Sequence, residues 1–287
     1  MTTTGTRSRV GSRWRERAQL IVLLTPPLVW LVVLYLGAIS VLLLSSLWTT
    51  DTFTNKVLHQ YSIGNLKHVY TQSLYRTVAF RTIGIALAVT AIDAIIAFPI
   101  AFYMSLVASP RVRRLMVVAV LTPLWASYLV KAYAWRSLLS PTGALSWVTG
   151  GHTPGYGETA TVITLAYMWL PYMVIPVFAG FERVPKSMLE ASTDLGAGLL
   201  RTMRSVLLPL VFPAIAAGSI FTFSLTLGDY IAVSIVGGKT QLIANLIQGQ
   251  LITANNQPLA AALSTVPLIA IVLYLLAMRR TGALENV

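Results

Sequence analysis

The stretch LEASTDLGAGLLRTMRSVLLPLVFP, residues 189–213, is decisive for the interpretation of this chain. Two acids, two arginines and two glycines stand there directly before one of the most apolar runs of the sequence. The whole chain has 287 residues, of which 56% are hydrophobic and only 10% are charged. In soluble domains about 25% of residues are charged. The composition therefore predicts an all-α membrane protein that crosses the bilayer several times.

Six stretches are long and apolar enough to span a membrane, which takes about 20 residues in a helix. The first follows an arginine-rich start. Its apolar run exceeds the roughly 7–15 residues typical of a signal peptide, so we expect it to be retained as a helix. The predicted transmembrane helices cover residues 20–47, 78–107, 115–139, 160–181, 206–231 and 259–278.

Lysine and arginine are concentrated in alternate connections, which indicates the orientation in the membrane. The basic segments are the N-terminal tail, the turn SPRVRR (109–114), the connection 182–205 and the pair Arg279 and Arg280, all expected on the cytoplasmic side. The connection 140–159 has no basic residue, which places it outside. Both termini are then cytoplasmic. The net charge of +12 is explained by topology, so no nucleic-acid partner is expected.

This pattern predicts a simple domain organisation. Residues 1–19 form a basic cytoplasmic tail, 20–280 a six-helix transmembrane domain and 281–287 a second cytoplasmic tail. The stretch quoted at the start falls on the cytoplasmic face.

Its local chemistry predicts a short helix lying along the membrane. Pro185 suits a helix start, and Gly196 suits a left-handed stop. Glu190 and Asp194, four residues apart, share one face of this helix, while Met188, Ala191 and Leu195 share another. An ordinary loop with a capped helix would look the same, so these residues alone leave both interpretations open.

A family resemblance favours one of them. Glu190-Ala191-Ser192, followed by Gly196, Val206 and Leu208-Pro209 at fixed spacing, resembles the EAA loop of ABC-importer permeases. Ser192 stands for the third small residue of that motif and Val206 for isoleucine; both keep the size class. In that family the loop is the coupling helix that docks on a cytoplasmic ATPase. The resemblance implies ATPase coupling by Glu190, Ala191, Ser192, Asp194, Gly196, Leu208 and Pro209.

A finer resemblance covers most of the chain from about residue 75. Segments 121–143, 167–197 and 225–238 look like the spermidine/putrescine-type permeases. The resemblance implies a type I permease fold in the bacterial cytoplasmic membrane. It also implies an ATPase dimer, a second permease chain that is homologous or identical, an extracytoplasmic solute-binding protein and a polyamine-like solute. The alternative is a secondary transporter driven by an ion gradient, which is disfavoured because the six helices show no inverted repeat.

No enzyme chemistry is expected. Cysteine is absent, which excludes a thiol nucleophile or a cysteine metal site. Gly238-Lys239-Thr240 resembles the end of a phosphate-binding loop, but position 233 is valine where that loop needs glycine. We therefore interpret Gly237-Gly238 as a turn, and predict no catalytic residue, cofactor or metal.

Candidates for the solute path are the ionisable residues inside the spans and nearby tyrosines. Asp93 lies in the middle of the second span, where an unpaired acid costs roughly 2.5–3.5 kcal/mol. Lys131, offset along the axis by about 7 Å, is its nearest candidate partner. Asp229, near the outer end of the fifth span, either caps a helix or contacts solute. Tyr133, with Tyr128, Tyr167 and Tyr172, either lines the path or belongs to an aromatic belt.

Overall fold

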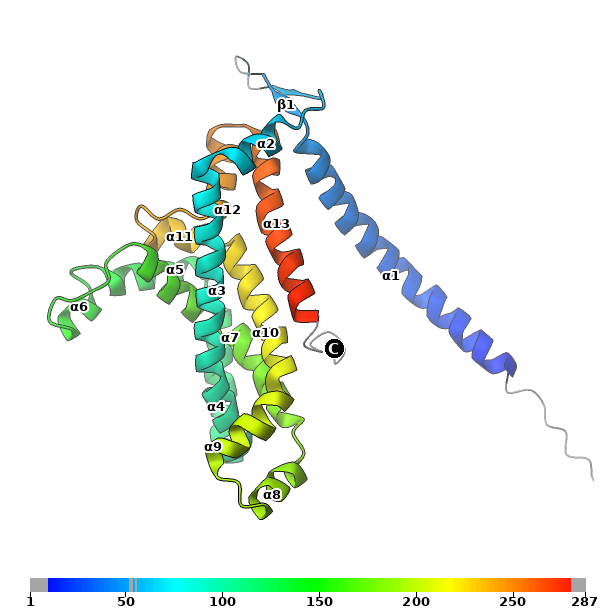
Figure 1. Ribbon diagram of the computed structural model, residues 1–287, viewed down its shortest axis with the longest axis vertical. Coiled ribbons are helices and arrows are strands. Elements are labelled where there is room, and N and C mark those ends of the chain that lie inside the picture. The colour runs from blue at the N-terminus through cyan, green and yellow to red at the C-terminus, as the bar shows by residue number, and fades with distance from the viewer. Residues whose placement is uncertain (1–9, 52–53, 55, 280–287) are drawn as a thin grey trace, which may run out of the picture.

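The computed structural model describes residues 10–51, 54 and 56–279, with side chains from residue 22 onward. Residues 1–9 of the predicted N-terminal tail, Arg280 and the predicted tail 281–287 lie outside the described residues. The described chain is almost entirely helical (Figure 1). Its long helices are α1 (Val10–Ser45), α3 (Ser73–Phe102), α7 (Glu158–Glu182), α10 (Leu208–Gly228) and α13 (Gln257–Arg279).

These five helices, with their extensions, are long and apolar enough to span a membrane, which confirms five of the six predicted spans. The π-helical turn η1 (Tyr103–Val107) prolongs α3. The short helix α9 (Leu199–Thr202) and the π-helical turn η2 (Met203–Leu207) precede α10 without interruption. The fifth span therefore begins at residue 199 instead of 206.

The third span differs from the prediction. A straight helix over 115–139 was expected, but the structure has α4 (Pro110–Trp125) and α5 (Tyr128–Leu139), bent by 98° at a short break. Ala126 and Ser127 are extended there, with ψ near 141° and 134°. Pro123, in the last turn of α4, lacks the amide hydrogen that a helix interior needs. The apolar run continues through this corner, so hydropathy alone does not reveal it.

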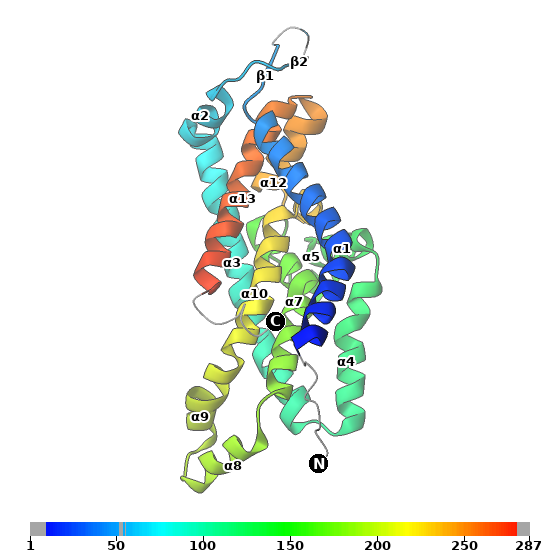
Figure 2. The same cartoon turned by 90° about the vertical axis from the view of Figure 1, so that its right-hand side faces the viewer.

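The core of the molecule lies between α3, α7 and α10, which run side by side (Figures 1 and 2). Toward one end, Val89 and Leu165 pack with residues of α5 and of α11 (Ile231–Val236). Toward the other end, Met173 and Phe181 of α7 pack against α3 and the start of α10. Glycines allow close approach in this bundle: Gly180 of α7 faces Ala214 of α10.

Short elements gather at the end of the molecule where α3 begins (Figure 1). They are a two-stranded antiparallel hairpin, α2 (Gly64–Thr71), α12 (Ile243–Gln248) and the π-helical turn η3 (Gly249–Thr253). The strands β1 (Thr49–Thr50) and β2 (Val57–Leu58) pair Thr49 with Leu58. Thr50 Oγ1 donates a 2.9 Å hydrogen bond to Asn256 Oδ1, which fastens the hairpin to the start of α13. The positive-inside pattern assigns this end to the outer face.

Helix α1 stands apart from the bundle (Figure 1). The apolar part of α1 is almost entirely exposed, with only 6% of it buried. Its contacts are with α13, and apolar side chains such as Trp30 and Leu34 are exposed. The chain alone leaves this helix to be covered by other molecules.

Candidate coupling surface and solute path

The coupling loop of the sequence analysis forms the end of the molecule opposite the hairpin (Figure 1). Helix α8 (Lys186–Asp194) follows α7 after three residues, and Pro185 is its N-cap. The predicted short helix is therefore present. Glu190 and Asp194 are exposed, as are Met188 and Leu195 on the neighbouring face. A surface that mixes acids with uncovered apolar side chains is typical of a protein docking site.

Gly196 ends α8 in the left-handed conformation that the sequence predicted, with φ at +74°. The amide of Ala197 donates to Ser192 O at 3.0 Å, and that of Gly196 donates to Thr193 O at 2.9 Å. This pair of bonds is the Schellman motif, which closes a helix over a glycine. A residue with a Cβ would be strained at this backbone conformation.

Ser192 connects α8 to the membrane helix that follows it. Its side chain is buried, and its hydroxyl bonds Thr202 Oγ1 of α9 at 2.8 Å. Ser192 occupies the position of the third small residue in the motif. The sequence analysis did not identify Thr202 as its partner. Beside it is a cavity of about 590 Å³ between α8 and the start of α10, with Pro209 on its wall.

Leu208 and Pro209, the end of the motif, form the first turn of α10. The proline has no amide hydrogen to offer the preceding turn, and that turn is the π-helical η2. Both side chains are exposed. The motif thus consists of an exposed short helix, a glycine stop and a proline in the first turn of α10, inside a continuous helix.

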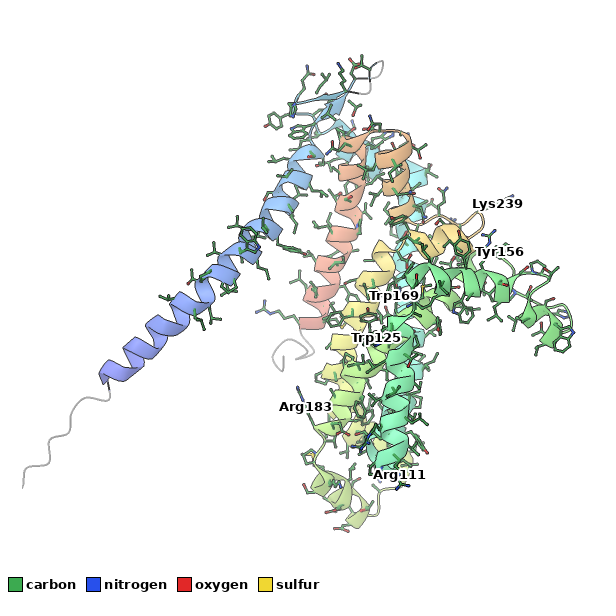
Figure 3. The ribbon with its side chains drawn as sticks, turned by 180° about the vertical axis from the view of Figure 1, so that it is seen from behind. Arg111, Trp125, Tyr156, Trp169, Arg183 and Lys239 are labelled. Carbon is green, nitrogen blue, oxygen red and sulfur yellow. The ribbon has the colours of Figure 1, made fainter. Side chains whose placement is uncertain are left out.

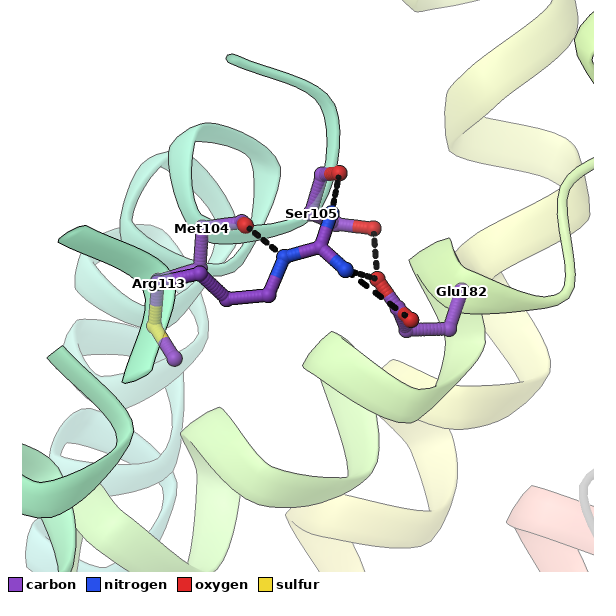
Figure 4. A network of polar contacts seen from close by, with 4 residues as sticks. All are labelled: Met104, Ser105, Arg113 and Glu182. Carbon is purple, nitrogen blue, oxygen red and sulfur yellow. Dashed lines mark hydrogen bonds and ion pairs between the residues drawn. The ribbon is translucent and has the colours of Figure 1, made fainter. Parts of the chain in front are cut away.

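A second network joins three helices just before α8 (Figure 4). Arg113 of α4 donates to Met104 O at 2.9 Å through Nε and to Ser105 O at 2.6 Å through Nη2. It also pairs with Glu182, the last residue of α7, at 3.3 Å. The hydroxyl of Ser105 donates to the same carboxylate at 2.9 Å. We call Arg113, Glu182, Ser105 and the Met104 carbonyl the Arg113 clamp. From the sequence alone, Arg113 was interpreted only as one of the basic residues that place this turn on the cytoplasmic side.

Asp229 lies between α10 and α11, and its side chain is 6% exposed. Its Oδ1 accepts the amide of Ala232 at 3.0 Å, which caps α11, and its Oδ2 accepts the hydroxyl of Tyr128. Within the described part of the chain, Lys and Arg side chains form no ion pair with it. The cap that the sequence suggested therefore exists, on α11 and not on the fifth span itself.

Asp229 also lines a cavity of about 270 Å³ whose walls include three aromatic side chains. Tyr128, Trp169 and Tyr230 contribute to it. The rings of Tyr128 and Trp169 lie 6.1 Å apart, and Trp169 contacts Tyr172 at 5.9 Å. The indole Nε1 of Trp169 is buried without a hydrogen-bond partner among the described residues. Sequence reasoning missed Trp169, although the segment 167–197 contains it. Figure 3 shows it beside the corner that follows Trp125.

The other predicted path residues are not brought into this cavity. Asp93 of α3 is fully buried, and neither carboxylate oxygen has a hydrogen-bond partner among the described residues. Lys131 is half-buried on α5. The ion pair expected between Asp93 and Lys131 is not formed. The corner at residue 126 explains this, because it carries Lys131 out of the straight helix on which the pairing was based. Tyr133, also on α5, is 58% exposed.

The glycine-lysine-threonine segment is a turn, as predicted. Gly238 has a φ of +58°, and the amide of Thr240 donates to Gly237 O at 2.8 Å. It packs against the loop before α7, where the guanidinium of Arg136 lies 4.7 Å over the Tyr156 ring (Figure 3 labels Tyr156 and Lys239). The described residues contain no group of three or more His, Cys, Asp or Glu side chains that could hold a metal.

A bundle of apolar spans with an exposed, charged helix at one end defines a membrane protein that crosses the bilayer several times. Comparison with known proteins identifies the family. Residues 5–280 match the family of binding-protein-dependent transport system inner membrane components. The inner membrane ABC transporter permease protein YdcU of Escherichia coli K12 is 40% identical over 284 residues, 93% of this chain and 90% of that protein. The spermidine/putrescine transport system permease protein PotB of Escherichia coli K12 is 31% identical over 221 residues, 74% of this chain and 80% of that protein.

A solved structure supports the fold. The bacterial alginate ABC transporter, in complex with its alginate-bound periplasmic protein, superposes with a TM-score of 0.70 at 15% identity, covering 96% of this chain and 97% of that one. The chain therefore belongs to the binding-protein-dependent transport system inner membrane components. It is a permease subunit of an ABC importer of the bacterial inner membrane, with the type I permease fold. It is not an enzyme, because ATP hydrolysis resides on a separate chain in such importers.

Proposed function

We propose that this permease docks a cytoplasmic ATPase dimer through α8 and conducts spermidine, putrescine or a similar small cation past Asp229. The complete importer would also contain a second permease chain, homologous or identical, and an extracytoplasmic solute-binding protein. One observation carries the solute proposal: a buried carboxylate, with no Lys or Arg partner among the described residues, stands in a cavity with three aromatic side chains in its walls.

The chemistry of that cavity suits an alkylammonium group. An ionised carboxylate accepts up to about four hydrogen bonds, and Asp229 accepts two from the protein through its side chain. Aromatic faces attract ammonium by about 0.5–2 kcal/mol, depending on desolvation. A volume of about 270 Å³ leaves room for an alkylammonium group beside the carboxylate. Conduction also needs binding weak enough for release at the other side.

The similarity to PotB, a permease protein of a spermidine/putrescine transport system, is in keeping with this solute class. The 40% identical relative is described only as an ABC transporter permease, which leaves the solute to experiment.

The docking half of the proposal is tested by copurification with a Walker-motif ATPase from membranes. Gly196→Asp places a side chain at a φ of +74° beside Asp194 and should abolish association while the chain still inserts. Gly198→Asp is the matched control, because its φ is −69°, no atom lies within 4 Å, and aspartate is a favoured N-cap there. Normal association of the Gly196→Asp chain would contradict docking through α8.

The solute half is tested by polyamine uptake with Asp229→Asn, which keeps the shape and removes the charge. We expect reduced uptake with the complex still assembled. Glu158→Gln, an exposed acid at the start of α7, is the control for a general effect of charge. Unchanged uptake at several polyamine concentrations would remove Asp229 from the path. Loss of the assembled complex would assign it to capping α11.

A further inference from the structure

The Arg113 clamp lies where motion of the docking helix enters the membrane domain. Glu182 is the last residue of α7, and α8 begins at Lys186, so three residues separate the clamp from the docking helix. On the other side of the clamp, Arg113 stands in the first turn of α4, and Ser105 belongs to η1 at the end of α3. Three membrane elements therefore meet at one guanidinium (Figure 4).

The geometry of the clamp favours a stiff joint over a simple charge pair. Arg113 and Glu182 have side chains that are 37% and 41% exposed, and ion pairs so exposed contribute little to stability. The guanidinium, however, is planar and presents its donors in a fixed fork. It uses that fork to bond two carbonyls of the π-helical turn η1 and a carboxylate at once. A cation at these carbonyls also complements the negative end of the helix dipole.

The two other helices reach α8 by different routes. α7 continues into α8 along the chain, and α10 is joined to it by the bond between Ser192 and Thr202. Among the described residues, no hydrogen bond joins α3 or α4 to α8, although Leu189 of α8 packs in one apolar cluster with residues of both helices. The polar contacts of the Arg113 clamp join α3 and α4 to the end of α7.

We propose that Arg113 and Glu182 are positioning residues for energy coupling: the clamp transmits displacement of α8 to α3 and α4. From Arg113, α4 runs to the corner at Trp125, and the next helix starts with Tyr128, the residue that holds Asp229. The docking helix and the solute cavity are thus joined through one helix. This inference rests on the proposed function, since it assumes that an ATPase moves α8.

A distance measurement tests the joint without any transport assay. The chain has no cysteine, so single cysteines at Arg111 on α4 and Ser187 on α8 can carry spin labels without other changes. In the purified permease we expect a single narrow distance distribution. Arg113→Gln should broaden or split it, while Arg114→Gln, an exposed arginine on the same turn, should not. Equal distance distributions in the wild type, Arg113→Gln and Arg114→Gln would refute the proposal that Arg113 holds α4 and α8 in a fixed arrangement.

Coupling is measured on the assembled importer as the ratio of ATP hydrolysis with and without loaded binding protein. Arg113→Gln and Glu182→Gln should each lower that ratio by about fivefold or more, the lower end of usual coupling between sites. Basal hydrolysis and ATPase association should stay unchanged. The double variant should be no worse than either single variant, because residues of one unit are not additive. Ser105→Ala, which removes one hydrogen bond and no charge, should lower the ratio less.

The outcomes separate the clamp from the proposed function. A wild-type complex that binds no ATPase refutes the proposed function, while the spin-label distances still test the clamp. If Arg113→Gln and Glu182→Gln retain the wild-type ratio of stimulated to basal ATP hydrolysis, or if their effects add, the clamp does not transmit displacement of α8. If either glutamine variant releases the ATPase, the clamp maintains the docking surface and transmission is refuted. If the glutamine variants fail to assemble, an unchanged ratio in Ser105→Ala refutes the proposal.

Discussion

Gly180 offers a quantitative test of how α7 and α10 pack. A Cβ built on this glycine would lie 2.5 Å from Cβ of Ala214 and 3.4 Å from Cγ1 of Val211. Carbon atoms prefer about 3.5–4.0 Å, so Gly180→Ala must separate the helices by about 1–1.5 Å. Overpacking of this kind costs about 1–3 kcal/mol. Alanine recovers about 0.5–1 kcal/mol through helix propensity, which leaves a net loss of about 0–2.5 kcal/mol.

The assay is thermal unfolding of the purified permease in detergent at one fixed scan rate. Gly180→Ala should lower the midpoint temperature. Adding Ala214→Gly should restore it, because the two methyl-sized volumes exchange places. Gly84→Ala in α3 is the control, since no atom lies within 4 Å of the new Cβ. A midpoint for Gly180→Ala at or above that of the wild type would refute the close contact, as would failure of the second change to rescue it. Uptake should fall in parallel, because Gly180 lies two residues before Glu182.

Three further predictions follow from the orientation and the contacts. Cysteines placed at Ser109 and Ser187 should react only with a reagent that reaches the cytoplasm, whereas one at Thr153 should react from outside; labelling of position 187 from outside would exclude it as an ATPase site. Thr202→Val removes the bond to Ser192 and leaves a buried hydroxyl unpaired, which costs about 1–3 kcal/mol; unfolding midpoints should fall, and Ser192→Ala in the same chain should restore part of the loss. Tyr128→Phe should weaken polyamine uptake less than Asp229→Asn, because the carboxylate keeps its charge; an equal loss would assign the hydrogen bond, not the charge, as the essential feature.

The helical spans were predictable because each is a long apolar run, and the hydropathy of a run does not depend on which other segments pack against it. The corner between α4 and α5 was not, since Trp125 to Tyr128 is as apolar as the helix around it. Its cause is local, a proline in the last turn followed by two extended residues. The start of the fifth span was placed too late, because Arg201 and Arg204 suggested a polar connection although both lie in continuous helix.

The conformation of the loop after α7 was predictable because its residues act locally: Gly196 needs only its own backbone angle, and Glu190 only its own helix face. Its docking on an ATPase stays a prediction. The Asp229 cavity and the Arg113 clamp depend on contacts between distant segments. Tyr128 and Asp229 are 101 positions apart, and Arg113 and Glu182 are 69 apart. A single sequence contains nothing that pairs such positions. The predicted pairing of Asp93 with Lys131 was wrong because the offset between the two residues was calculated for a straight helix over 115–139.

The corner after Trp125 has a consequence for how the protein enters the membrane during synthesis. Helix α4 has 16 residues, which corresponds to about 24 Å, whereas the hydrocarbon core of a bilayer is about 30 Å thick. Three arginines stand in its first five positions, so its apolar part is shorter still. The segment is a poor substrate for the insertion machinery as an isolated helix. Before α7 is made, the bonds of Arg113 to the carbonyls of Met104 and Ser105 would let α3, already in the bilayer, retain α4 as the second arm of a hairpin.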